Sequence, residues 1–421
     1  MRRTITSIFV VALAFVTGGP GVRETEARAA SEPDVVLEWN QLLQDTIPSN
    51  ASLAAPRFYS MMHIAMFDAA NSVDREYSSY RVQLGRPGAS PEAAAAQAAH
   101  DVLVALLPAS QTAYDAALAA RLARFSPGMR MLSAAAGSAV AREILDWRAN
   151  DGWGASPPPY TLPPFPGLWQ PAPGAAAFTQ YPQVTPFALL TGTQYLPPPP
   201  PTLTSARYAQ DFDEVSRLGS ATSAERTTEQ TEIARLFAAV GTRTNLYMLW
   251  NNVARDLVRE RSLGLVEAAR LFVLLNVGII DGVQTTMASK YVYGLWRPVT
   301  AIRRAAEDLN PLTNGDPAWT PLLSTPPYPS YAGNQACVAS AAARALEMVA
   351  GGDDFAFTAV WQAPNNSVLA SRAYTGFKEM ADEQARSRVY GGIHFTFDNE
   401  ASQQLCPGVV DFVARHFMVP N

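Results

Sequence analysis

One segment of the chain, Leu263–Ile280, is apolar on almost every side and limits the folds that the chain can adopt. Only Glu267, Arg270 and Asn276 interrupt its apolar residues. A helix that is apolar around its whole circumference is stable in water only when other elements enclose it. We therefore predict a buried central helix over this segment.

Segments with helical periodicity precede this run. Apolar residues three and four positions apart are typical of amphipathic helices. We find this spacing in Glu92–Leu107, Leu132–Trp147, Ser205–Arg217, Ser223–Val240 and Asn245–Arg261. We find no sustained alternation bounded by hairpin turns, so strands are not expected. The predicted fold class is all-α, with two packed helical bundles.

Prolines divide the chain into two helical parts. Fifteen of the 33 prolines lie between Pro157 and Pro201, and a regular helix cannot persist through them. We predict an extended segment that wraps over a helical surface. The expected division is a signal peptide (1–30), an N-terminal helical region that ends in the Pro-rich wrap (31–201), and a C-terminal helical bundle that carries the functional site (202–421).

The first residues have the pattern of a secretory signal. Arg2 and Arg3 precede the apolar run Ile5–Val16, and Ala27–Ala29 offers a small-residue cleavage site. The apolar run is shorter than the roughly twenty residues that span a bilayer. We expect an exported protein, periplasmic or secreted, with no membrane span in the mature chain; the export route stays open. In an oxidising compartment Cys337 and Cys406 can pair, although two buried thiols fit the sequence equally well.

Composition excludes some partners. The net charge is −5 and there are no Lys/Arg blocks, so nucleic acid is not an expected partner. Charged residues are only 16% of the chain, which favours large buried faces and is compatible with a homo-oligomer. Gly-rich nucleotide fingerprints, zinc-peptidase motifs and serine-hydrolase elbows are absent from the sequence.

Lys290 and Arg297 are the first candidates for a functional site. They are seven positions apart, so on one continuous helix both would project from the same face. Pro298 disfavours helix at Arg297, which predicts a kink or a stop that leaves the guanidinium at a helix end. An ordinary solvated face is the alternative interpretation.

Two further segments hold candidate residues. A proline turn leads through Gly333 into a predicted helix, Gln335–Val349, with Asn334 as its N-cap. Free N–H groups at such a helix start attract oxyanions, although a plain helix cap is the alternative. Farther on, Arg388 precedes a double glycine and then His394, which is expected to open the last helix. Together Lys290, Arg297 and Arg388 supply donors for a tetrahedral oxyanion, and His394 supplies a nucleophilic or metal-ligating nitrogen.

These blocks resemble the vanadium-dependent haloperoxidases and the related type 2 phosphatidic acid phosphatase (PAP2) superfamily. The family pattern is Lys, six residues, Arg-Pro; then Pro-Ser-Gly-His; then Ser-Arg, five residues, His. The first and third blocks match in full, and the N-terminal half, with Glu38–Asn40 and Met66–Ala70, looks like bacterial secreted members. The resemblance implies that His394 binds vanadium, that the three cations hold vanadate oxygens, and that peroxide and halide are the small-molecule substrates.

The middle block departs from the family pattern. Ala332, Gly333, Asn334 and Gln335 stand where Pro, Ser, Gly and His are expected, so Gln335 replaces the acid/base histidine and cannot titrate. Asn334 and Gln335 can still donate hydrogen bonds to an oxyanion, so binding is expected to survive better than turnover.

Three hypotheses follow from this departure. The first is a haloperoxidase-like oxidoreductase with impaired activity. The second is an exported acid phosphatase that uses His394 as nucleophile on a phosphate ester. The third is a non-catalytic, anion-binding helical protein.

Asp281 and Asp398 are further acids that the sequence places near the site cations. Either would pair with a cation of the site or remain a solvated or capping acid.

Overall fold

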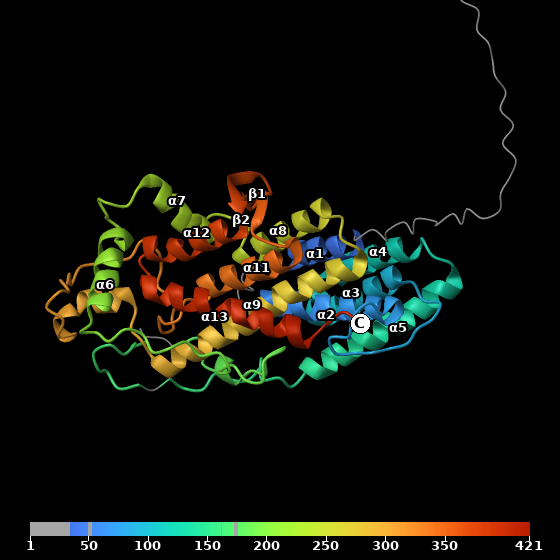
Figure 1. Ribbon diagram of the computed structural model, residues 1–421, viewed down its shortest axis with the longest axis horizontal. Helices are drawn as coiled ribbons and strands as arrows, with labels where there is room; N and C mark the ends of the chain where they lie inside the picture. The colour runs from blue at the N-terminus through green and yellow to red at the C-terminus, as the bar shows by residue number, and fades with distance from the viewer. Residues whose placement is uncertain (1–33, 49–52, 161, 172–175) are drawn as a thin grey trace, which may run out of the picture.

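The computed structural model describes residues 34–48, 53–160, 162–171 and 176–421, and the predicted signal peptide lies outside these residues. The described chain is mainly helical (Figure 1). Its N-terminal helices are α1 (Asp34–Thr46), α2 (Ala55–Asp74), α3 (Pro91–Leu106), α4 (Gln111–Leu122) and α5 (Pro127–Arg148). The later elements are α6 (Ala206–Gly219), α7 (Thr228–Phe237), α8 (Leu246–Glu260), α9 (Leu265–Tyr293), α10 (Pro298–Arg303), α11 (Asn334–Ala350), β1 (Asp354–Gln362), β2 (Val368–Gly376), α12 (Phe377–Tyr390) and α13 (Thr396–His416).

Helix α9 is the central helix that the apolar run predicts. Nearly every residue from Leu265 to Lys290 is buried, because α2, α11 and α13 all pack against this helix. The helix continues beyond the predicted end at Ile280 to Tyr293, and its last turns bury polar residues as well as apolar ones. Although α9 is strongly apolar, no helix in the described ranges combines the length and hydropathy that a membrane crossing needs.

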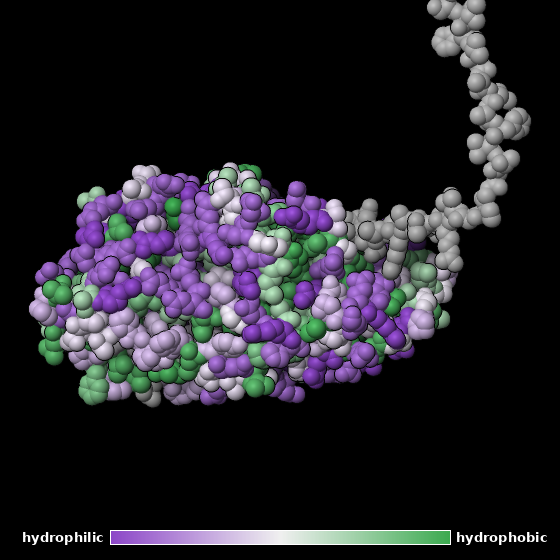
Figure 2. Space-filling view, in the orientation of Figure 1, coloured by the Kyte–Doolittle hydropathy of each residue, from purple (hydrophilic) through white to green (hydrophobic). Residues whose placement is uncertain are grey.

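The N-terminal helices pack closely because their contact faces carry small residues. Ala93–Ala99 of α3 are buried. Gly137 of α5 lies against α3 so tightly that a Cβ atom there would be 2.5 Å from the carbonyl oxygen of Ala94. One apolar core joins these helices to α9 and to the C-terminal helices. On the face shown in Figure 2, polar residues predominate and apolar residues form separate patches.

The Pro-rich segment contains no α-helix in its described residues, as predicted; only a short 3₁₀ turn, Tyr181–Gln183, interrupts it. It runs along one side of the molecule beside α9 and α13 (Figure 1). Asp281 of α9 holds it in place by accepting backbone N–H bonds of 2.7 to 3.0 Å from residues 187–189. Asp281 therefore anchors the Pro-rich wrap and does not hydrogen-bond a cation of the candidate site.

A β-hairpin contradicts the expectation that strands are absent. Strands β1 and β2 pair antiparallel, and the hairpin packs on α8 and α12. Phe355, Phe357, Ala359 and Trp361 of β1 are buried while the residues between them are mostly exposed. This alternation is present in the sequence, but the prediction missed it because the flanking segments are helical.

A disulfide joins α11 to α13. Cys337 and Cys406 are bonded, with their Cα atoms 5.4 Å apart, which confirms the paired alternative and excludes two free thiols. Gly282 of α9 leaves space for the bridge, because a Cβ atom there would be 2.7 Å from the Cys337 sulfur. The disulfide therefore ties together two helices that begin at the candidate site.

Candidate oxyanion site

The helices that carry the candidate residues meet at the end of the bundle where α6 lies (Figure 1), and α10 packs on α6 there. The end of α9, the end of α12, the start of α13 and the segment that leads into α11 meet there. Lys290, Arg297, Arg388 and His394 are all at least 93% buried. The alternative of a solvated Lys/Arg face is therefore wrong for these residues.

The helix stop predicted ahead of Pro298 is confirmed, so Lys290 and Arg297 do not lie on one continuous helix. Helix α9 ends at Tyr293, and Gly294 follows with φ +60°, a left-handed conformation that favours glycine. Arg297 thus lies outside α9 and is the N-cap of α10. The two cations nevertheless face one aromatic ring: Lys290 Nζ is 5.5 Å and Arg297 Cζ is 5.1 Å from the centroid of Tyr328.

The ammonium group of Lys290 holds the segment before α11. Its Nζ donates to the carbonyl oxygens of Ser330 (2.6 Å) and Ala332 (2.5 Å). Burial and the neighbouring charge of Arg297 lower the pKa of Lys290 well below its ordinary value. A second anion partner would favour the charged form of this lysine.

The Arg297 guanidinium is only partly satisfied. Nε donates to the Tyr328 carbonyl (2.9 Å), and Nη1 donates to the Ile393 carbonyl (2.8 Å) and to Nε2 of His394 (3.0 Å). Its Nη2 is buried and has no partner in the described part of the chain. A guanidinium only donates hydrogen bonds, so the contact with His394 assigns the acceptor lone pair to Nε2.

Asp398 fixes the other side of the imidazole. The Nδ1–H of His394 donates to Asp398 Oδ2 (2.8 Å), which also accepts from Ser330 Oγ (2.5 Å) and the Phe395 N–H (3.1 Å). Burial and the three surrounding cations lower the pKa of His394 well below its ordinary value. Burial raises the pKa of Asp398 to about 6. At neutral pH the imidazole is therefore neutral, with its Nε2 lone pair directed at Arg297.

Ser330 is a site residue that sequence reasoning missed. Its hydroxyl lies between Asp398 and His394, 3.5 Å from Nδ1 of the imidazole. The resemblance gave this position no role, since it lies outside the three motif blocks. The signal available in the sequence was its place inside the proline turn that leads to the middle block.

Arg388 is the least satisfied cation of the site. It lies in the last turn of α12, and its buried Nε and Nη1 have no partner among the described residues. Burial and the charge of Arg297 lower the pKa of Arg388 to about 10. Asp398 is the carboxylate whose charge acts on Lys290 and Arg297. Three cations, one carboxylate and a neutral imidazole leave a surplus of positive charge.

The start of α11 differs from the prediction. Gly333, not Asn334, is the N-cap, and no side chain caps the helix. The Gly333 N–H is bonded to the Asp398 carbonyl (2.8 Å), and a Cβ atom at Gly333 would be 2.6 Å from Asn399 Oδ1. The Asn334 side chain turns toward α9, where its Oδ1 accepts from Thr286 (2.9 Å) and its amide nitrogen contacts a methionine sulfur.

Gln335 lies between the candidate site and α12. Its carbonyl accepts from Gln384 Nε2 (2.8 Å), one turn before Arg388, while its own side-chain Oε1 is buried without a partner in the described ranges. The other three histidines lie elsewhere, on α2, on α3 and at the end of α13. No second histidine therefore takes the place of the one missing from the middle block.

Comparisons with known proteins bear on the fold of the chain. Residues 270–420 match a family model described as the VCPO second helical-bundle domain. The structure is similar to that of the first bacterial vanadium-dependent iodoperoxidase, at 24% identity and TM-score 0.76, over 93% of this chain and 98% of that one. It is also similar to holo-type and apo-type bacterial vanadium-dependent chloroperoxidase. The holo-type match has 15% identity and TM-score 0.69 over 89% of this chain and 94% of that one. The apo-type match has 17% and 0.68 over 88% and 95%. A search of curated proteins finds no match.

Proposed function

Because the chain has the helical fold of the vanadium haloperoxidase and PAP2-like superfamily, we propose that it binds a tetrahedral oxyanion, vanadate, and acts as a haloperoxidase-like oxidoreductase on peroxide and halide. The proposed ligands are Lys290, Arg297, Arg388 and His394. The observation that carries this proposal is the set of three buried nitrogens, Arg297 Nη2 and Arg388 Nε and Nη1, that have no partner among the described residues.

Energetics favour an anion over a neutral guest. A buried donor without a partner costs about 1–3 kcal/mol, so three such donors are a considerable destabilisation that a suitable ligand removes. An oxyanion accepts hydrogen bonds in several directions at once and also offsets the surplus positive charge. Charge-assisted hydrogen bonds from guanidinium groups to oxyanions are roughly twice as strong as neutral ones. The donor set therefore fits vanadate or phosphate.

His394 is suited to face the bound anion. Asp398 keeps the proton on Nδ1, so the Nε2 lone pair, which accepts from Arg297 in this structure, can act as a ligand or a nucleophile once Arg297 donates to the anion instead. Bound vanadate would supply a Lewis-acidic centre at which peroxide is activated toward halide. Arg297, which now donates to Nε2, also carries the free Nη2 and is placed to donate to the anion. The first turn of α11 has no side-chain cap, so its backbone N–H groups after Gly333 are further candidate donors.

Gln335 makes the proposed enzyme a slow one. The amide can donate and accept hydrogen bonds but does not titrate near neutral pH, so it cannot act as a general acid or base. Loss of a general acid or base costs about 10²–10⁴ in rate, whereas the donors that bind the anion remain. We therefore propose tight oxyanion binding together with reduced turnover.

A second candidate function rests on the same imidazole. A neutral histidine whose Nδ1–H is held by a carboxylate is a competent nucleophile toward a phosphate ester, so an exported acid phosphatase is the alternative. The non-catalytic alternative is an anion-binding protein with the same donors and no turnover. Export to a periplasmic or extracellular compartment is part of the proposal, and the Cys337–Cys406 disulfide supports an oxidising compartment.

The experiment measures vanadate binding by calorimetry and halide oxidation with peroxide by bromination or iodination of an organic acceptor. His394→Ala should lose both signals, while His416→Ala, an exposed change at the other end of α13, should keep both. If the wild type oxidises halide in the presence of vanadate no faster than His394→Ala does, the haloperoxidase proposal is contradicted. A phosphoenzyme trapped at His394 with an activated aryl phosphate would favour the phosphatase, and binding without either activity would favour the non-catalytic protein.

A further inference from the structure

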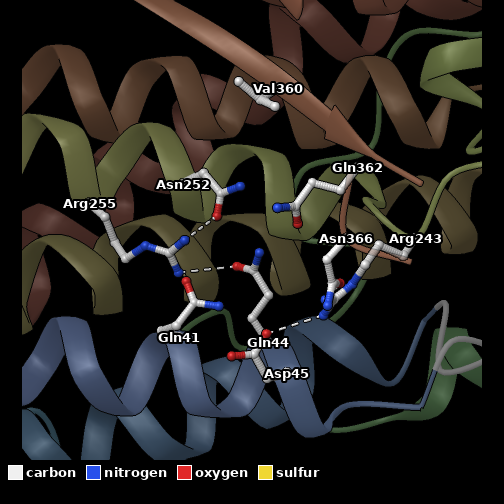
Figure 3. A pocket seen from close by; sticks show the side chains of 9 residues that line it. All are labelled: Gln41, Gln44, Asp45, Arg243, Asn252, Arg255, Val360, Gln362 and Asn366. Carbon is white, nitrogen blue, oxygen red and sulfur yellow. Dashed lines mark hydrogen bonds and ion pairs between the residues drawn. The ribbon is translucent and has the colours of Figure 1, made fainter. Parts of the chain in front are cut away.

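A polar cavity of about 310 Å³ lies away from the candidate oxyanion site, between α1, α8 and the end of β1 (Figure 3). None of the proposed oxyanion ligands lines it. The loop before α8 closes one side, because the Arg243 N–H donates to the Gln362 carbonyl (2.8 Å). The cavity thus joins an N-terminal helix to C-terminal elements, and its size is at the lower end of the range for small-molecule sites.

Arg255 of α8 is the buried cation of this cavity. Its side chain donates only to amide oxygens: those of Asn40 (3.0 Å), Gln44 (3.2 Å) and Asn252 (2.6 Å). No described carboxylate forms an ion pair with it, and the residue is 7% exposed. Burial lowers the pKa of Arg255. The protein therefore keeps this guanidinium without a direct ion pair among the described residues, and Asp256 and Asp45 act on it only through the charge of their carboxylates.

Arg255 also fixes the direction of the amides. A guanidinium has no acceptor atom, so Gln44 and Asn252 must present their oxygens to it and direct their NH₂ groups elsewhere. Figure 3 shows both NH₂ groups directed into the shared space, together with that of Gln362 from β1. The side chains of Gln362 and Gln41 form no hydrogen bond with another described residue. The cavity wall thus presents donors to its interior.

Charges at the rim set the net charge of the site. Asp45 is the carboxylate that lines the cavity, and it is paired with Arg243 (3.2 Å). Arg243 also donates to Asn366. The two guanidinium groups and one carboxylate leave one positive charge, which Arg255 carries. A ligand with a single negative charge would therefore neutralise the cavity without leaving a surplus of negative charge.

We propose that this cavity binds a small organic carboxylate with a hydroxyl or oxo group, as in a hydroxy acid. The carboxylate accepts from the side-chain NH₂ groups beside Arg255, and the further oxygen bonds to the remaining amides. The volume exceeds what a single halide fills, and a doubly charged phosphate would leave the site net negative. This inference does not depend on the function proposed for the oxyanion site.

The experiment titrates the full-length protein with sodium lactate by calorimetry, with lactamide and sodium chloride at matched ionic strength as comparison ligands. The key variant is Asn252→Asp, which gives Arg255 a carboxylate partner and turns a donor of the cavity into an acceptor. We expect its thermal stability without ligand to stay equal or rise, and its lactate affinity to fall at least about tenfold. Asn150→Asp, the same charge change in the exposed turn after α5, should bind lactate like the wild type.

Two outcomes overturn the inference. One is an equal response of the wild type to lactate, lactamide and chloride; the other is undiminished lactate binding by a folded Asn252→Asp protein. Arg388→Gln separates the two anion sites, since it should lose vanadate binding and keep lactate binding. Loss of lactate binding in Arg388→Gln would place the carboxylate at the oxyanion site and also contradict the inference.

Discussion

Replacement of Arg388 by methionine should stabilise the ligand-free protein while it weakens oxyanion binding. Arg388 is 7% exposed, and two of its nitrogens are buried without partners among the described residues. Methionine is a long unbranched side chain, somewhat shorter than arginine, with no charge and no donors, and its flexible thioether adapts to irregular buried space. The substitution therefore removes an unfavourable buried charge without leaving a large cavity.

The magnitude follows from the pKa of Arg388. One pKa unit corresponds to about 1.4 kcal/mol, so a pKa lowered to about 10 makes the charged form about 3 kcal/mol less favourable in the fold than in the unfolded chain. We expect the free energy of unfolding at pH 7 to rise by about 1–3 kcal/mol. Two lost charge-assisted hydrogen bonds, each about 1.5–3 kcal/mol, should weaken vanadate binding by at least about 100-fold.

Urea unfolding with and without vanadate measures both effects on the same samples. The wild type should gain stability when vanadate is added, and Arg388→Met should gain little. Arg142→Met, an exposed change on α5, serves as the control and should behave like the wild type. A less stable Arg388→Met protein that still binds vanadate with wild-type affinity would refute the reasoning.

Three further predictions follow from the buried groups and the disulfide. Burial lowers the pKa of His63 to about 3, so the unfolded chain takes up a proton at a higher pH than the folded protein does. The free energy of unfolding should therefore fall as pH drops from about 6.5 toward 3, by up to about 5 kcal/mol. His63→Gln should flatten this part of the profile, and an unchanged slope in urea unfolding at different pH values would contradict the prediction. The Cys337–Cys406 bridge spans a sequence separation of 69 residues, so the free energy of unfolding of the double Cys→Ala protein should be about 4 kcal/mol lower than that of the wild type. Equal stability of the two proteins by calorimetry would show that the bridge adds nothing. Gln335→His should raise the rate of peroxide-dependent halide oxidation by about 10²-fold or more. If the variant still binds vanadate and its rate equals that of the wild type, the missing histidine does not limit turnover.

The central helix and the Pro-rich wrap could be predicted because their signals are local. An all-round apolar run must be buried wherever it lies, and closely spaced prolines prevent a helix in any context. The closeness of Lys290, Arg297, Arg388 and His394 was predicted from motif spacing and resemblance. Composition alone contains no information about which distant residues meet.

Other features depend on contacts between distant parts of the chain and were missed or misplaced. Arg297 reaches the site because Gly294 ends α9 in a left-handed turn. This confirms the helix stop predicted from Pro298, whereas the seven-residue spacing along one continuous helix does not apply. The N-cap of α11 is Gly333 because α13 holds its N–H and occupies the space beside it. The sequence of α11 does not contain that information.

The roles of the two acidic residues also required the fold. Asp281 and Asp398 were equivalent in the sequence as acids near the site cations. Asp281 instead accepts the backbone of the Pro-rich wrap, while Asp398 orients His394 and accepts the hydroxyl of Ser330. The difference arises because one side of α9 faces the wrap and the start of α13 faces the cations.

A crystal structure of the wild-type protein grown with orthovanadate tests the central claim most directly. The account predicts tetrahedral density within hydrogen-bond distance of Arg297 Nη2 and of Arg388, beside His394 Nε2, with Asp398 still bonded to Nδ1. Two results would contradict the account. One is vanadate bound only on the protein surface. The other is a structure at saturating vanadate in which no anion lies between Arg297, Arg388 and His394.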